Sequence, residues 1–208
     1  MARYTGPKHR LCRRIGNCLW DDPKCPSKKK PYAPGMHGAG GGGGKRRGSK
    51  MSNYARHLLE KQKLRMTYGL LERQFRNTFA RAQNLEGVAG DNFLQLLERR
   101  LDNMVYRLGF APSIFAARQL VNHGHFLVDG KKVDIPSYIV RVGQTISVRE
   151  RSKQTPVFLE SIERRNRKIP EYLQCNVEGL EGKLLVVPRA TDIPVKVDTN
   201  LIVEFYSR

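Results

Sequence analysis

The first quarter of the chain cannot build an apolar core of its own. Residues 1–50 hold 13 basic and 2 acidic side chains, a net charge of +11, and no acidic residue occurs between Asp22 and Glu60. Five prolines interrupt any regular element, and residues 35–48 contain eight glycines. We expect a basic N-terminal arm whose glycines allow close backbone approach to phosphate groups. A flexible, solvated tail is the alternative that the composition leaves open.

Charge also limits the class of partner that the whole chain can have. The 208 residues include 38 Lys and Arg against 19 Asp and Glu, a formal charge of +19, whereas residues 171–208 hold 4 basic and 6 acidic side chains. Such a field favours a polyanion over a small-molecule substrate. No apolar run approaches the roughly 20 residues of a membrane span, and no secretory signal opens the chain. With four cysteines, we expect a reduced, cytoplasmic protein without a membrane partner.

Helical periodicity begins after the arm. Ser52 can cap a helix over residues 52–68, and apolar residues at four-residue spacing predict a second helix over residues 70–84. The clearest amphipathic stripe runs through residues 91–108, and Ser113 can cap a shorter helix directly after it. We expect these last two helices to form a unit that resembles a helix-turn-helix.

Strand signals follow the helices. Residues 126–128 and 131–133 flank the pair Asp129-Gly130, which is typical of a tight hairpin turn. Two more short strands are predicted at residues 138–142 and 146–149. The alternation of short apolar runs and turn residues indicates a small antiparallel sheet.

The fold class that these elements predict is α+β. Residues 92–150 form a compact module of two helices on the small antiparallel sheet, and the flanking segments after the basic N-terminal arm are mostly helical. A further helix is predicted at residues 156–168, and strand-like runs occur at residues 184–187 and 201–206.

Four candidate metal ligands lie within the arm. His9, Cys12, Cys18 and Cys25 have the spacing H-x₂-C-x₅-C-x₆-C. Three thiolates and an imidazole can hold Zn²⁺ tetrahedrally, and such a closed structural site would staple a segment that lacks a core. The gaps are wider than in a typical zinc knuckle, so unrelated free cysteines are the alternative. Cys175 is expected to be a packed thiol outside this group.

The sequence contains no recognisable catalytic motif. We find no P-loop, no HExxH and no GxSxG pattern, and a four-ligand zinc site leaves no open position for a reacting water. We therefore expect a non-catalytic RNA-binding protein rather than an RNA-modifying or zinc-dependent enzyme. A general DNA compactor would also explain the charge, but amphipathic helices and specific motifs weigh against it.

Short motifs along nearly the whole chain resemble those of one known family. They are Ala2-Arg3-Tyr4, Pro34-Gly35-Met36-His37-Gly38, Leu71-Glu72-Arg73-Gln74-Phe75-Arg76-Asn77, Arg100-Leu101-Asp102-Asn103, Ala117-Arg118-Gln119-Leu120-Val121-Asn122-His123 and Ile202-Val203-Glu204-Phe205-Tyr206-Ser207. Together they are highly specific, although each alone would be weak. The chain resembles the S-four family of bacterial small-subunit ribosomal proteins.

The resemblance implies a domain organisation and a function. Residues 92–150 would be an S-four RNA-binding domain inserted into a helical domain built from residues 51–91 and 151–208. The protein would be a structural constituent of the small ribosomal subunit, in a bacterium or an organelle. It would be a primary binder of 16S rRNA that nucleates assembly of the 30S body. With its neighbours, notably ribosomal protein S-five, it would contribute to translational accuracy, and it could repress its own messenger RNA.

The resemblance also implies site residues. Some members carry a four-cysteine zinc site in the arm, and His9 stands where the first of those cysteines would lie. The family's RNA contacts map onto cationic and polar residues of all three parts of the chain: Arg3, Lys8, Arg13, Arg14, Lys45, Arg46, Arg47, Lys50, Arg56, Lys61, Lys63, Arg73, Arg76, Arg118, Asn122 and His123. The glycine run at residues 40–44 departs from the family's shorter, more basic segment.

Overall fold

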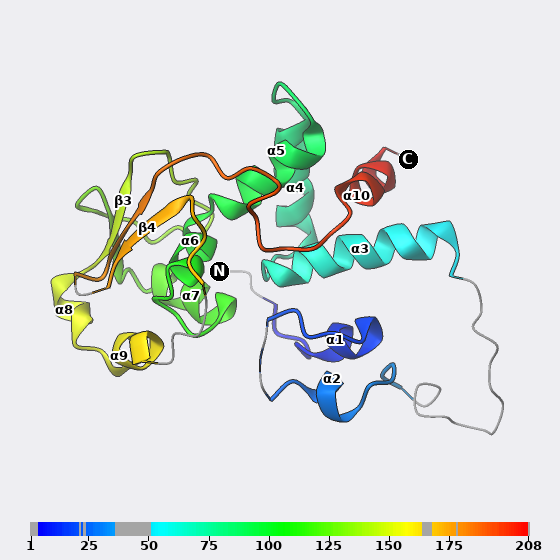
Figure 1. The fold of residues 1–208 in the computed structure, drawn as a ribbon, viewed down its shortest axis with the longest axis horizontal. Coiled ribbons are helices and arrows are strands. Elements are labelled where there is room, and N and C mark those ends of the chain that lie inside the picture. The colour runs from blue at the N-terminus through cyan, green and yellow to red at the C-terminus, as the bar shows by residue number, and fades with distance from the viewer. Residues whose placement is uncertain are drawn as a thin grey trace. The chain divides into compact units, whose positions relative to one another are not determined.

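The computed structural model describes residues 4–20, 22, 24–35, 51–163, 168–177 and 179–207, with the backbone alone at 162 and 163. In this part of the chain, ten helices and a five-stranded antiparallel sheet confirm the α+β class (Figure 1). The chain divides into two compact units. We call residues 1–75 with 197–208 the N-terminal unit and residues 76–196 the central unit. The predicted boundaries of the arm, the helical domain and the module stay a prediction.

The basic arm contains regular structure that the sequence did not predict. Helix α1 spans Arg10–Ile15 and helix α2 spans Pro26–Lys29. Pro26 starts α2 instead of breaking it, because a proline at the first helical position has no N–H to satisfy. The expectation that prolines exclude every helix from the arm was therefore wrong.

Helix α3, Asn53–Thr67, forms the long element of the N-terminal unit. Ser52 caps it as predicted, because its side-chain oxygen accepts a hydrogen bond of 3.2 Å from the Ala55 N–H. Helix α10, Thr199–Tyr206, packs against α3, with the Tyr54 and Phe205 rings 5.8 Å apart.

The prediction of a strand at residues 201–206 was wrong, because this segment is the helix α10. A short apolar run fits a buried strand and a buried helix equally well, so periodicity cannot separate them. Asp198 caps the start of the helix, because its side chain accepts a hydrogen bond of 3.0 Å from the Asn200 N–H.

The helix predicted at residues 91–108 is divided in two. Helix α4, Glu72–Gln83, precedes α5, Ala89–Glu98, and α6, Leu101–Arg107. Between α5 and α6, Arg100 has extended backbone angles and forms a β-bridge with Ile139. The apolar stripe continues in phase across this break, which is why the sequence did not reveal it.

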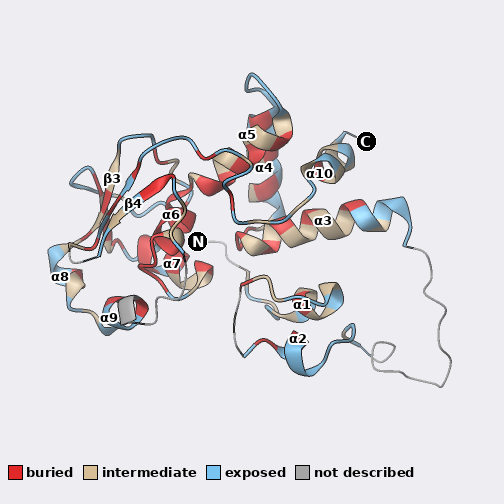
Figure 2. Cartoon of the chain, viewed as in Figure 1, coloured by how far each residue is buried: buried red, intermediate tan, exposed pale blue. Residues whose placement is uncertain are grey.

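Helix α7, Ile114–Asn122, is capped by Ser113 as predicted, with the Ala116 N–H 3.2 Å from the serine oxygen. Helices α6 and α7 contact each other and are mostly buried (Figure 2). Helices α8, Glu150–Lys153, and α9, Pro156–Glu163, follow the module. The helix predicted at residues 156–168 is confirmed as far as Glu163, Lys168 is not helical, and residues 164–167 lie outside the described part.

The sheet has the strand order β2-β1-β3-β5-β4. The strands are β1, Phe126–Val128; β2, Lys131–Lys132; β3, Thr145–Val148; β4, Leu173–Asn176; and β5, Glu181–Leu184. The predicted hairpin is confirmed, since Asp129 and Gly130 have φ values of 48° and 76°, the positive values that its tight turn requires.

Two other strand predictions need correction. The strand expected at residues 138–142 is reduced to the single bridge at Ile139. The run at residues 184–187 enters the sheet only at Leu184, because the following apolar side chains are exposed and form no ladder. Instead, β5 pairs with β3, so that residues far along the chain extend the sheet of the module.

Gly182 of β5 is a point of close packing. A Cβ atom at this position would overlap the Leu108 side chain, which is buried directly after α6. Close-packed interiors accommodate an extra methyl group only by distorting the backbone or neighbouring rotamers. The glycine therefore allows the polypeptide after α6 to lie against the sheet.

We expect Gly182→Ala to lower the free energy of unfolding by about 1–3 kcal/mol, the usual cost of overpacking. Urea unfolding followed by circular dichroism measures this change. Lys183→Ala is the matched control, because Lys183 is exposed in the same strand. Equal stability of the two variants would contradict this packing.

Candidate nucleic-acid interface and metal centre

The four predicted metal ligands form one cluster. One potential ligand atom from each of His9, Cys12, Cys18 and Cys25 lies within 4.8 Å of all the others. Tetrahedral zinc with Zn–S distances of about 2.3 Å requires sulfur atoms about 3.8 Å apart, so small adjustments would complete the geometry. The structure thus brings these three thiols together, as the predicted site requires, and zinc binding itself stays a prediction. Cys175 lies in the central unit, outside the cluster.

Two neighbouring side chains orient the His9 imidazole of the cluster. Nδ1 of His9 lies 3.2 Å from the Cys25 sulfur, and Nε2 lies 3.4 Å from the Asp22 carboxylate. A carboxylate on the second nitrogen fixes the orientation of the ring, as is usual for histidines that ligate metals. His9 thus offers Nδ1 to the centre of the cluster.

The thiols of the cluster differ in acidity. Burial raises the pKa of Cys12 to about 12 and also raises the pKa of Cys18. Burial opposes ionisation of Cys25 as well, but hydrogen bonds from the side chain and backbone of Ser27 outweigh it and lower the pKa of this thiol. The cluster is closed, because Cys12 and Cys25 are buried and all four ligand groups come from the protein. This donor set fits a structural Zn²⁺ ion.

Trp20 connects the cluster to α3. Its ring packs edge-on against His9, with centroids 5.5 Å apart, and its indole N–H donates a hydrogen bond of 3.3 Å to the Thr67 carbonyl. Trp20 is buried, so the cluster and this indole together supply a small core for a segment with few apolar side chains.

Most predicted RNA contacts that the structure describes face solvent. The exposed ones are Lys8, Arg14, Arg56, Arg73, Arg76, Asn122 and His123. Arg13 and Lys63 are half-buried, and the Arg13 guanidinium lies over the Tyr32 ring at 4.9 Å. The predicted contacts Arg3, Lys45, Arg46, Arg47 and Lys50 lie outside the described residues.

Lys61 and Arg118 are buried instead of exposed. The Lys61 ammonium lies 2.7 Å from Glu72 and 4.7 Å above the Phe205 ring, so it holds α10 to α3. Burial opposes ionisation of Glu72, but hydrogen bonds from Lys61 and Tyr206 outweigh it and lower its pKa. In the structure, the charge of Lys61 faces the Glu72 carboxylate and that of Arg118 faces the Asp102 carboxylate. Their contacts with RNA stay predictions.

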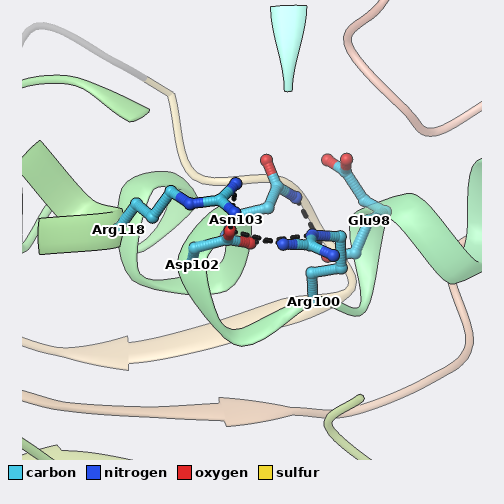
Figure 3. A network of polar contacts seen from close by, with 5 residues as sticks. All are labelled: Glu98, Arg100, Asp102, Asn103 and Arg118. Atoms are coloured by element: carbon cyan, nitrogen blue, oxygen red, sulfur yellow. Dashed lines mark hydrogen bonds and ion pairs between the residues drawn. The ribbon is translucent and has the colours of Figure 1, made fainter. Parts of the chain in front are cut away.

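A buried ionic network organises the module (Figure 3). Asp102 of α6 accepts two hydrogen bonds from the Arg100 guanidinium, at 3.0 and 2.7 Å, and lies 3.7 Å from Arg118 of α7. The Asn103 side chain donates a hydrogen bond of 2.9 Å to the Glu98 carbonyl, which ties α6 to the end of α5. Asp102 therefore sets the position of α7, whose far end carries the exposed Asn122 and His123.

The network continues through a carboxylate that the sequence did not indicate. Glu98 is fully buried, and its Oε1 accepts hydrogen bonds of 2.6 Å from both Arg107 and Tyr172. Burial and the adjacent carboxylate raise the pKa of Tyr172, so the phenol stays a donor. Arg107 and Tyr172 lie 9 and 74 residues after Glu98 in the sequence. Neither separation matches the repeat of a helix or a strand, so no sequence pattern indicates that these side chains meet.

Comparisons with known proteins cover the whole chain. Residues 3–98 match the family model "Ribosomal protein S4/S9 N-terminal domain", and residues 99–146 match "S4 domain". The chain is 49% identical over 216 residues to small ribosomal subunit protein uS4 of Clostridioides difficile (strain 630) and 51% identical over 208 residues to that of Geobacillus kaustophilus (strain HTA426). It is 53% identical over 209 residues to that of Limosilactobacillus fermentum (strain NBRC 3956 / LMG 18251). Each alignment covers 100% of both proteins.

None of the described helices is both long and apolar enough to cross a membrane.

We expect Asp102→Ala to destabilise the protein by about 3–5 kcal/mol, because it leaves the buried Arg100 charge without its partner. Asp134→Ala is the control, since Asp134 is exposed in the same unit, and we expect a change within about 0.5 kcal/mol. Urea denaturation of both variants checks this, and similar midpoints would show that the network contributes little.

Proposed function

We propose, because the chain belongs to the small ribosomal subunit protein uS4 family, that it is a structural constituent of the small ribosomal subunit that binds rRNA. The observation that carries this proposal is identity of about half over the full length of both proteins. The net charge of +19 supports a polyanionic partner. Family membership, and not the lack of a catalytic motif, is the reason to treat the chain as a structural protein rather than an enzyme.

The finer proposal is that the chain is a primary binder of 16S rRNA. Cations are exposed on both units, with Arg56 and Arg73 on the N-terminal unit and Arg76 on the central unit, which also exposes the hydrogen-bonding side chain of His123. Phosphate and ribose-hydroxyl contacts dominate recognition of folded RNA, because its deep major groove hides the base edges. Each unit would use its own exposed cations to hold the phosphates of the RNA that it touches.

This geometry suggests how binding would promote assembly. Holding several RNA helices in their folded arrangement favours folded rRNA over its open forms. The folded rRNA would then nucleate the 30S body. The slightly acidic residues 171–208 are divided between the two units, and their carboxylates are suited to contacts with neighbouring ribosomal proteins such as S-five. A contribution to translational accuracy would act through that neighbour, and binding to its own messenger RNA would use the same cationic residues.

The cluster of His9, Cys12, Cys18 and Cys25 is proposed to hold one structural Zn²⁺ ion. When bound, the ion would cross-link three points of a segment that has few apolar side chains. The protein's own contribution is to bury Cys12 and Cys25, to orient His9 through Asp22 and to brace the ring with Trp20.

Metal analysis tests the zinc site directly. We expect about one equivalent of zinc per chain in the purified protein and its loss in Cys12→Ala. Cys175→Ala should retain the metal, because Cys175 lies outside the cluster. Wild-type protein with less than about half an equivalent would exclude a structural zinc site.

Filter binding tests the RNA assignment. A 16S rRNA fragment should bind far more tightly than bulk RNA or bulk DNA, and its affinity should fall steeply with salt. Arg73→Gln combined with Arg76→Gln should reduce the slope of log affinity against log salt by about 2, one for each lost phosphate contact. Lys183→Gln combined with Lys196→Gln, at two exposed positions in the acidic C-terminal part, is the charge-matched control. Equal affinity for all three nucleic acids would refute the proposal.

A further inference from the structure

The N-terminal unit contains a pocket of about 480 Å³ that the functions above do not use. It opens between α1, the polypeptide around Tyr4 and Pro34, and the C-terminal half of α3. This volume falls in the usual range for sites that hold small organic molecules, about 300–1,000 Å³. It is large enough for a single nucleotide and too small for a duplex.

The charges that line the pocket are all positive. Arg10 and Arg14 are one helical turn apart on α1, and Arg65 of α3 also lines the pocket, with no acidic residue among the lining groups. Like charges at this spacing repel each other. Neither Arg10 nor Arg14 forms an ion pair with any described residue, and the Arg65 Nε lies 3.7 Å from Glu72, too far for a hydrogen bond. An anion in the pocket would relieve this repulsion.

The remaining lining suits a nucleobase. Tyr4 offers an aromatic side chain, and Leu11 and Met66 offer apolar surface. Gln62, also in the lining, has an amide that can both donate to and accept from the edge of a base, and it makes no other side-chain hydrogen bond among the described residues. Single-stranded RNA is recognised in this way, with an unstacked base against aromatic or guanidinium planes and its edge hydrogen-bonded.

We infer that this pocket takes one unstacked nucleotide of the bound RNA, with the phosphate held by the arginines and the base against Tyr4, Leu11 and Gln62. The inference rests on the proposed RNA-binding function and adds a site of shape recognition to it. Arg10, Leu11 and Arg14 alternate along α1 with His9 and Cys12 of the cluster. One short helix therefore contributes both to the cluster and to the pocket.

Filling the pocket without changing its charge is the critical experiment. Gln62→Trp in the full chain should lower affinity for the 16S rRNA fragment on the order of 10-fold or more, the range for losing one stacked base. The salt slope should also fall, by about 1, because the phosphate held by the pocket arginines is displaced with the base. Arg14→Gln should likewise lower the affinity and the slope, but by removing the cation and not by blocking the base. The control is Gln83→Trp at an exposed position of α4.

The outcomes separate the two proposals. Wild-type protein that does not prefer the 16S fragment would refute the RNA assignment itself. Wild-type protein that binds the fragment specifically, with Gln62→Trp within twofold of it, would refute only the pocket. Zinc content and thermal unfolding equal to wild type establish that Gln62→Trp is folded.

A second measurement does not depend on any variant. Ultraviolet irradiation of the wild-type complex, followed by mass spectrometry, should place an RNA adduct on peptides with Tyr4 or with residues 62–66. Adducts elsewhere and none on these peptides would overturn the inference. A parallel sample with the four free nucleoside monophosphates distinguishes the source of the nucleotide. If the free nucleotides form adducts on these peptides and the RNA does not, the inference that the pocket takes a nucleotide of the bound RNA would be overturned.

Discussion

Repulsion among cationic side chains is the constraint that the rest of this structure must satisfy. With 38 basic and 19 acidic residues, the chain cannot pair every charge, and a compact fold brings its cations closer together. The structure responds by placing selected carboxylates inside. Glu98 and Asp102 are almost fully buried, each against arginines that would otherwise destabilise the interior. The acids thus neutralise the cations that must be inside and leave the outer cations to a partner.

The arm, which is also rich in cations, has a cluster of potential metal ligands where a larger domain would have an apolar core. Between residues 4 and 35, the buried side chains of the described part are Cys12, Trp20, Cys25 and Ser27. Two of them are thiols of the cluster, and the indole packs against its imidazole. A segment of this composition gains little from hydrophobic burial, so a closed set of metal ligands is an effective way to fix its arginines in space.

The sequence predicts local structure well where one residue controls one element. Ser52 and Ser113 begin their helices, and the Asp129-Gly130 turn makes its hairpin, because each effect acts within a few residues. Prediction from the sequence fails where tertiary contacts determine the secondary structure. Arg100 leaves the helix to bridge with Ile139, and residues 201–206 become helical against α3. The four potential metal ligands were predictable from residue type, whereas the pairing of Glu98 with Tyr172 required the fold.

The packing of α10 on α3 joins segments on either side of the entire central unit. During synthesis, α3 leaves the exit tunnel long before the residues that form α10. The central unit has all its strands and helices available first, so it can fold while the N-terminal unit still waits for its last helix. The N-terminal unit can therefore be completed only after the whole central unit has been synthesised. A nascent chain that presents its cationic residues early must keep them from RNA, or bind RNA before its own fold is complete.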